Sequence, residues 1–160
     1  MQKITPCLWF NFNAEEAVQY YLSIFESGRI LEESRYGDAI PELEGKILTM
    51  RFELEGQVLL ALNGGPQFPF SEAISLFVDC ETQSEVDHYW DRLCAGGSPG
   101  RCGWLKDKFG LSWQIVPRSL VTMLQDDDTQ RSARVMRAMM AMSKIEVGEL
   151  EKAYDNNLIK

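Results

Sequence analysis

Few residues of this 160-residue chain have the types and spacing that site chemistry needs. There is one histidine, His88, and there are four scattered cysteines, Cys7, Cys80, Cys94 and Cys102, with no CxxC pair. A zinc site of the usual nitrogen and sulfur ligands cannot be assembled from this set. The cysteines fall mostly in apolar stretches, which favours buried, reduced thiols in a cytoplasmic protein. No nucleophile–base pair is visible, so the sequence assigns no catalytic residue.

Two further motifs look like cofactor sites and have simpler explanations. The side chains of Asp126, Asp127 and Asp128 are consecutive and do not converge on a cation, whereas acids at the start of a helix complement its dipole. Gly64 and Gly65 follow an expected strand but precede Pro66 and no helix. They therefore lack the strand-to-helix turn on which an adenosyl cofactor normally sits. No cofactor is predicted.

Composition excludes several classes of protein. Hydrophobic residues make up 45% and charged residues 25% of the chain, as in ordinary globular domains that bury a core without metals or disulfides. The longest apolar runs, 58–62 and 138–142, are too short to span a membrane. The net charge of −8 argues against a nucleic-acid partner, because it repels the phosphate backbone.

The elements that must position any site occur twice in the sequence. A strand over 5–12 is followed by a helix that Asn13 and Glu16 should start as a capping box and that Gly28 should end. Shifted by 69 residues, a strand over 73–80 precedes the pair Thr82 and Glu85, and apolar residues again follow at helical spacing.

Further strands follow each helix, and the last part of the chain is helical. Strands are expected over 30–36, 47–54 and 57–62 in the first copy, and over 102–106 and 111–116 in the second. We therefore predict an α+β domain over 1–118, made of two βαβββ modules (1–66 and 67–118). Residues 119–160 are expected to form a helical extension that packs on this domain or on a second subunit, because short helices need such packing.

Three segments give this chain a family resemblance. TPCLWFNFNAEEAVQYY, EAISLFVDCETQSEVDHYWDRL and, most specifically, CGWLKDKFGLSWQIVP resemble the PhnB-like branch of the vicinal oxygen chelate superfamily. That superfamily includes glyoxalases, bleomycin-resistance proteins and dioxygenases, and this branch is also labelled demethylubiquinone methyltransferase-like. The resemblance implies paired βαβββ modules whose mixed sheet forms a cup, in a homodimer. Methyltransferase activity is not expected, because the glycine-rich turn for the methyl donor is missing.

The resemblance also implies where a divalent metal would bind. Its ligands would come from the first and last strand of each module, and counting from the helix caps and turn glycines gives Pro6, Ser75, Leu60 and Gln114. Proline and leucine side chains cannot ligate a metal, and serine and glutamine are weak alone. The sequence therefore predicts no metal site.

Strand alternation then predicts the lining of the cup. The expected ligand-binding residues are mostly apolar, with a few polar groups on one half: Gln114, Ser75, Ser112, Phe10, Phe77, Leu60 and Trp104. Leu8 is expected on the same face as Phe10. Gln114 is the expected polar focus, because an amide offers both a donor and an acceptor without charge. Satisfaction of this amide by Ser112, Ser75 or the backbone is the structural alternative.

Three functions remain open at this point. The leading hypothesis is a homodimeric protein that binds a small, largely apolar molecule in a metal-free cup, with the reaction unassigned. The second is a metal-dependent lyase or dioxygenase of the same superfamily, and the third is a dimeric interaction module whose cup is filled by aromatic side chains. Methionines at 136, 139, 140 and 142 favour a subunit contact formed by the extension.

Overall fold

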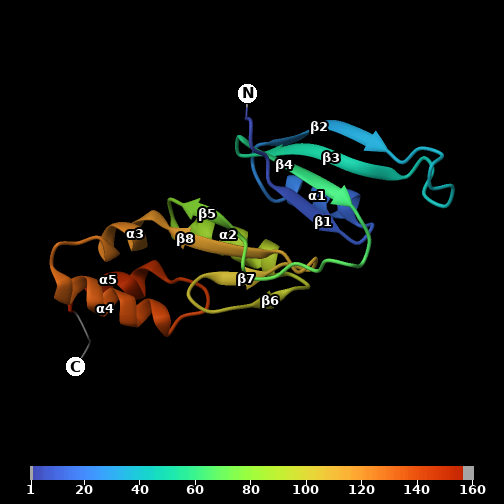
Figure 1. Cartoon of the computed structure of the whole chain (residues 1–160). Coiled ribbons are helices and arrows are strands. Elements are labelled where there is room, and N and C mark those ends of the chain that lie inside the picture. The colour runs from blue at the N-terminus through green and yellow to red at the C-terminus, as the bar shows by residue number, and fades with distance from the viewer. Residues whose placement is uncertain (1, 157–160) are drawn as a thin grey trace. The chain divides into compact units, whose positions relative to one another are not determined.

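The structure, a computed structural model, describes residues 2–156 and divides the chain into two compact units. One unit extends to Phe70 and the other begins at Ser71. Each contains a four-stranded mixed sheet with one helix packed on it (Figure 1). The predicted α+β class, with two βαβββ modules and a helical C-terminal part, is confirmed. None of the helices within the described residues is long and apolar enough to cross a membrane.

The first unit contains sheet A and helix α1 (Ala14–Leu22). Its strands are β1 (Cys7–Phe10), β2 (Gly28–Arg35), β3 (Ile47–Leu54) and β4 (Gln57–Asn63), in the order β1-β4-β3-β2. β1 and β4 run parallel, and the other pairs are antiparallel. Glu55 and Gly56 both have positive φ in the tight β3–β4 turn, which gives the hairpin the twist of its strands.

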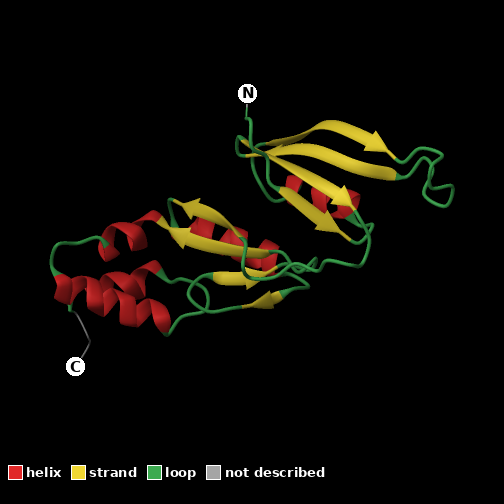
Figure 2. Ribbon diagram, in the orientation of Figure 1, coloured by secondary structure: helices red, strands yellow, loops and turns green. Residues whose placement is uncertain are grey.

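The second unit repeats this arrangement with sheet B and helix α2 (Gln83–Cys94). Its strands are β5 (Ser75–Cys80), β6 (Ser98–Pro99), β7 (Trp104–Lys106) and β8 (Ser112–Pro117), in the order β5-β8-β7-β6. β5 and β8 are the parallel pair. In Figure 2 each sheet has its own helix on one side, and the side turned away from that helix is called the open face of the sheet.

The two capping boxes have different outcomes. The Thr82 box is confirmed, because Thr82 Oγ1 accepts a hydrogen bond from the Glu85 N–H at 3.2 Å. The Asn13 box is wrong, because the Asn13 side chain makes no capping bond. The start of α1 is capped instead by the buried Asn63 at the end of β4, whose Oδ1 accepts from the Ala14 N–H at 2.9 Å. The Nδ2 of the same side chain donates to Glu15 and to the Ile47 carbonyl.

The strand-to-helix loops of the two modules differ in length by one residue. Two residues separate β1 from the cap Asn13, and one separates β5 from the cap Thr82. The additional residue is accommodated by Phe12, whose φ is 57°. A constant shift of 69 residues therefore aligns the helices but misaligns the strands, and a one-residue slip in a strand exchanges its two faces.

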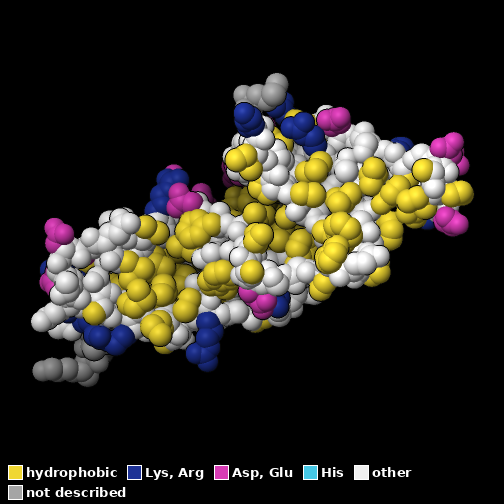
Figure 3. All heavy atoms as spheres, viewed as in Figure 1, with side chains coloured by type: hydrophobic (Ala, Val, Ile, Leu, Met, Phe, Trp, Pro, Cys, Tyr) yellow, Lys and Arg dark blue, Asp and Glu magenta, His cyan; other side chains and the backbone are white. Residues whose placement is uncertain are grey.

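The helical extension comprises α3 (Arg118–Leu124), α4 (Thr129–Met140) and α5 (Val147–Asp155). It packs on Val116, near the end of β8, through the buried residues Leu120, Val135, Ile145 and Leu150. Hydrophobic side chains gather in this part of the second unit in Figure 3. The α4–α5 loop is also hydrogen-bonded to the second unit, because Ser143 and Met142 carbonyls accept from Gly103 and Cys102 at 2.8 and 2.9 Å.

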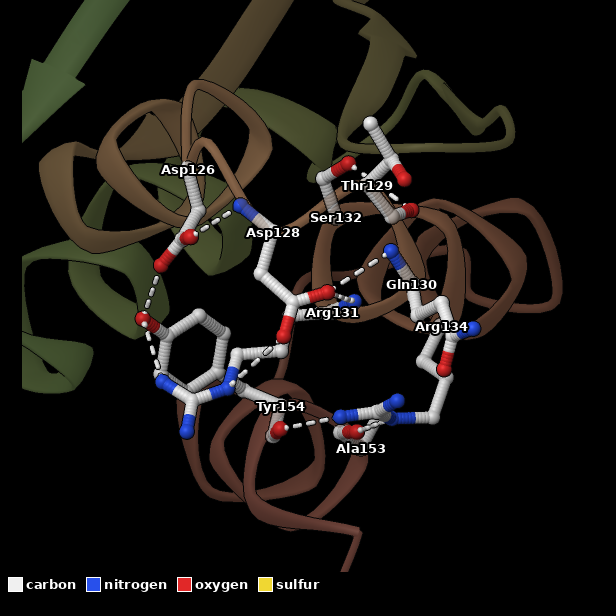
Figure 4. A network of polar contacts seen from close by, with 9 residues as sticks. All are labelled: Asp126, Asp128, Thr129, Gln130, Arg131, Ser132, Arg134, Ala153 and Tyr154. Atoms are coloured by element: carbon white, nitrogen blue, oxygen red, sulfur yellow. Dashed lines mark hydrogen bonds and ion pairs between the residues drawn. The ribbon is translucent and has the colours of Figure 1, made fainter.

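A polar network joins the loop before α4 to α5 (Figure 4). Tyr154 donates its hydroxyl proton to Asp126 and accepts from Arg131 at 3.4 Å. Arg134 donates at 2.8 Å to the carbonyls of Ala153 and Tyr154 at the end of α5, where the last carbonyls of a helix lack partners within the helix. Asp128 caps α4 by accepting from the N–H groups of Gln130 and Arg131. Asp126 and Asp128 therefore have structural roles at the start of this helix.

Candidate functional site

The open face of sheet B carries two rows of side chains that the strand register brings side by side. Gln114 on β8 lies between Phe77 on β5 and Trp104 on β7. In the next row, Ser112 lies between Ser75 and Lys106. Because side chains on one face alternate along a strand, all six share this face, while Trp113 and Ile115 are buried on the side of α2.

Gln114 is the polar centre of this face. Its Nε2 donates to Ser75 Oγ at 2.9 Å, and its Oε1 accepts no hydrogen bond from the described residues. The amide is thus half satisfied, and one acceptor stays available between the two aromatic residues. Phe77 is 54% exposed, and Gln114 and Trp104 are partly buried.

Ser112 and Lys106 provide the second row with an orphan hydroxyl and a cation. Ser112 is 1% exposed, and its Oγ has no hydrogen-bond partner among residues 2–156. Lys106 Nζ lies 2.6 Å from Glu72 Oε1. The hydrogen bond from Lys106 lowers the pKa of the Glu72 carboxyl, so this carboxylate is ionised at neutral pH.

Sheet A presents a different surface at the equivalent positions. Leu60 lies on the open face, as predicted, between Cys7 and Arg51. Phe10 does not: it is 2% exposed and pairs with Asn63, whose side chain reaches the start of α1. Leu8 is buried on the same side. The prediction that Phe10 faces the cup is wrong because of the additional residue before Asn13, which shifted the inferred strand register by one.

The corrected register also changes the positions at which a superfamily metal would be held. Beside Leu60 and Gln114 the first-strand residues are Cys7 and Phe77, not Pro6 and Ser75. A thiol, an amide and two hydrocarbon side chains do not fit a Mg²⁺, Mn²⁺ or Fe²⁺ site, which needs several oxygen or imidazole donors. Within residues 2–156, no three His, Cys, Asp or Glu side chains are grouped to hold a metal.

An adenosyl methyl donor does not fit the glycine pair either. A Cβ at Gly64 would lie 2.4 Å from the ring of Trp9, so Gly64 is needed for this close approach. Trp9 Nε1 donates to the Gly65 carbonyl at 2.8 Å. The segment folds back against the end of β1 and opens no helix, so its N–H groups do not form a phosphate-type cradle.

Asp107 is a buried charged residue that the sequence analysis missed. Its Oδ1 accepts from the Phe109 and Leu111 N–H groups at 2.8 and 3.1 Å, and its Oδ2 accepts from Trp113 Nε1 at 2.9 Å. It therefore fixes the β7–β8 turn and orients β8, on which Ser112 and Gln114 lie. An Asp-x-x-Gly sequence entering a predicted turn was the available signal.

The comparisons with known proteins agree with this fold. Residues 2–116 match the family model described as 3-demethylubiquinone-9 3-methyltransferase. The PhnB protein from Bacillus cereus is 36% identical, with a TM-score of 0.66, and the match covers 72% of this chain and 99% of that one. A search of curated proteins finds no match.

Two more distant structures share the fold alone. Protein PA1353 from Pseudomonas aeruginosa is 23% identical over 73% of this chain and 98% of that one, with a TM-score of 0.60. The fosfomycin resistance protein FosX from Listeria monocytogenes is 17% identical over 78% of this chain and 98% of that one, with a TM-score of 0.52. The chain therefore belongs to the 3-demethylubiquinone-9 3-methyltransferase family, the PhnB-like branch of the vicinal oxygen chelate superfamily.

Proposed function

We propose that this protein binds a small, largely apolar molecule on the open face of sheet B, without a metal ion and with Gln114 as the orienting polar group. The observation that carries the proposal is the row Phe77–Gln114–Trp104, in which a residue with an available amide oxygen lies between two aromatic residues in the strand register. Few, well-placed polar groups among apolar walls are typical of small-molecule sites. The reaction, if one follows binding, is unassigned.

The neighbouring polar atoms suit a ligand that bears a hydroxyl or a protonated nitrogen. Gln114 Oε1 can accept a hydrogen bond from such a group, while the indole N–H of Trp104 has no partner among the described residues and can donate. Methyltransferase activity is not part of the proposal, because the turn at Gly64 and Gly65 does not fit an adenosyl cofactor.

Binding should be tested by thermal shift against a metabolite panel, with the wild type and Gln114→Leu compared. The substitution removes only one half-buried hydrogen bond, so the loss of stability should be about 1 kcal/mol or less. Ligand-induced stabilisation should disappear, because it depends on [L]/Kd. Gln57→Leu, at the exposed first residue of β4, is the matched control and should keep the shift.

Two results would overturn the proposal. A loss of several kcal/mol in Gln114→Leu would show that the amide is a structural core group. Stoichiometric Mn²⁺, Fe²⁺ or Zn²⁺ in protein purified without chelator, absent from Gln114→Leu, would favour a metal-dependent lyase or dioxygenase.

We also propose that the protein acts as a homodimer in the cytoplasm. Met136 and Met140 of α4 are 41% and 57% exposed, and flexible methionines suit a contact between subunits. The four cysteines are free, which suits a reducing compartment.

A further inference from the structure

The second row of the open face, Ser75–Ser112–Lys106, contains a buried hydroxyl that nothing in the described chain satisfies. Ser112 Oγ is inaccessible and without a partner, although buried polar groups are normally hydrogen-bonded. Neither neighbour in the row is hydrogen-bonded to it: Ser75 Oγ accepts from Gln114 Nε2, and Lys106 Nζ contacts Glu72. A group that pairs with Ser112 must therefore come from outside these residues.

The Lys106–Glu72 ion pair connects the two sides of the strand that carries Ser112. Lys106 is on β7, Glu72 lies three residues before β5, and β7 and β5 are the two neighbours of β8. The Lys106 and Glu72 side chains are 41% and 63% exposed. Exposed ion pairs contribute little to stability, because water screens them and the long side chains lose rotamer freedom. Another anion can therefore replace Glu72 on Lys106 at small cost.

The other charged groups on this face are already paired elsewhere. Asp79, two residues after Phe77, is bound to Arg118 Nε at 2.6 Å, and Arg118 also contacts Glu81. Lys106 is therefore the cation of the rows around Gln114. Lys106 is the β7 neighbour of Ser112. The Ser112 hydroxyl is buried while Lys106 is paired with Glu72, so an anion would reach it only by displacing Glu72 and moving the Lys106 side chain.

We propose that the ligand of this site is an aromatic anion, whose acidic group displaces Glu72 from Lys106 and accepts a hydrogen bond from Ser112, while its ring lies between Phe77 and Trp104. This proposal rests on the proposed function and adds the chemical class of the ligand. Ser112 and Gln114 are two residues apart on β8, about 6.7 Å along the strand. That is the spacing of the two backbone positions, and the Gln114 amide itself reaches toward the second row, where its Nε2 donates to Ser75. A ligand with one benzene ring and a para hydroxyl would present this hydroxyl to Gln114 Oε1.

The probes for the test are 4-hydroxybenzoate, 4-hydroxyphenylphosphonate and the neutral 4-hydroxybenzamide. Ligand-observed NMR titrations at pH 7 should give tighter binding of an anion than of the amide. The anion that binds with the lower Kd shows whether the acidic group of the ligand is a carboxylate or a phosphonate.

Three variants separate the roles of the residues. Glu72→Gln should tighten anion binding severalfold, because it removes the internal competitor while keeping Lys106. Lys106→Met should weaken it at least about tenfold, or about 1.4 kcal/mol. Ser112→Ala should weaken it severalfold without loss of thermal stability, since its hydroxyl has no partner in the free protein. Lys108→Met is the matched control and should leave it unchanged, because Lys108 Nζ lies over the Phe109 ring.

The outcomes distinguish this inference from the function on which it rests. Equal affinity for the amide and the anions, no anion binding, or weaker anion binding in Glu72→Gln would overturn the aromatic-anion proposal. A neutral molecule that binds the wild type but not Gln114→Leu would still support binding at this face. A stability loss in Ser112→Ala would show that the hydroxyl is structural and would also overturn the proposal.

Discussion

At the scale of single residues, the most informative side chains are the polar ones that lie where an apolar residue would be expected. Asn63 ends β4 on the helix side of sheet A and is 3% exposed. Its one amide satisfies the first N–H of α1 and the Ile47 carbonyl, two groups from different elements. A single side chain thus sets how α1 sits on its sheet.

Asn63→Ala should lower the free energy of unfolding by about 3 kcal/mol, because it leaves a buried N–H and a buried carbonyl without partners. Chemical denaturation measures this loss. Asn13→Ala is the control: the Asn13 side chain makes no capping bond, so the change should be below about 0.5 kcal/mol. The reverse order of the two losses would mean that Asn13 caps α1 in solution.

The cysteines differ in reactivity because they differ in burial. Desolvation raises the pKa of the Cys80 thiol to about 12, so it is protonated at neutral and mildly alkaline pH. Iodoacetamide at pH 8, followed by peptide mass spectrometry, should label the exposed Cys7 before Cys80. Preferential labelling of Cys80 in the native protein would contradict its burial beneath α2.

At the scale of elements, the sequence predicted helices and strands well but placed one strand face wrongly. Thr82 and Glu85 form the expected box because the capping signal is local. Asn63 could not be found in this way, since it caps a helix from 49 positions further along the chain. Phe10 was placed on the wrong face because the additional residue before Asn13 leaves helix periodicity unchanged. On sheet B the face assignment of Ser75, Phe77, Ser112 and Gln114 agrees with the register, because that loop has no such insertion.

The helical extension is attached to α2 through side chains. Gln83 donates to the Ile145 carbonyl at 3.1 Å and accepts from the Val147 N–H at 2.7 Å. Lys144 Nζ lies 2.6 Å from Asp87 Oδ1. Hydrogen bonds from Lys144 and then from Gln83 lower the pKa of the Asp87 carboxyl. The Asp87–Lys144 contact therefore stabilises the attachment fully at a pH above the ordinary pKa of an aspartate, about 4. This stabilisation is lost as the pH falls below that value and through the lowered pKa of Asp87 in the folded protein.

Lys144→Met should raise the pKa of Asp87 toward its ordinary value, because the carboxylate loses its strongest hydrogen bond. A carboxyl-carbon NMR titration of the full chain measures this change. Lys152→Met should leave the Asp87 titration unchanged, since Lys152 pairs with Glu149 within α5. An unaltered pKa in Lys144→Met would show that the α4–α5 loop is not bound to α2 in solution.

At the scale of the whole molecule, the extension is the part that the family match does not include. The matched region ends at residue 116, and α3 begins at Arg118. The cluster of Val116, Leu120, Val135, Ile145 and Leu150 nevertheless makes the extension continuous with the core of the second unit.

Light scattering of the full chain should give about twice its mass of 18.3 kDa, if exposed apolar residues such as Met136 and Met140 are covered by a second copy. Met136→Glu with Met140→Glu should shift the mass toward that of the monomer. Arg131→Glu on the same helix is the charge control, although it also removes the Tyr154 contact. A wild-type mass of 18.3 kDa at micromolar concentration would contradict the homodimer.

The packing of Val116 against the helical extension closes one end of the proposed ligand-binding face. Val116 is two residues beyond Gln114 on β8 and, by alternation, on the same face, where Leu120 and Val135 cover it. Such a wall limits length at one end only. Substituents could lengthen a bound molecule past Ser112 and Glu72, whereas each added atom beyond Gln114 would meet packed helices. The helical extension would thus limit ligand length at the Gln114 end. In a homologous series of ligands, affinity should fall sharply once a substituent extends past Gln114 and should change little when one extends past Ser112.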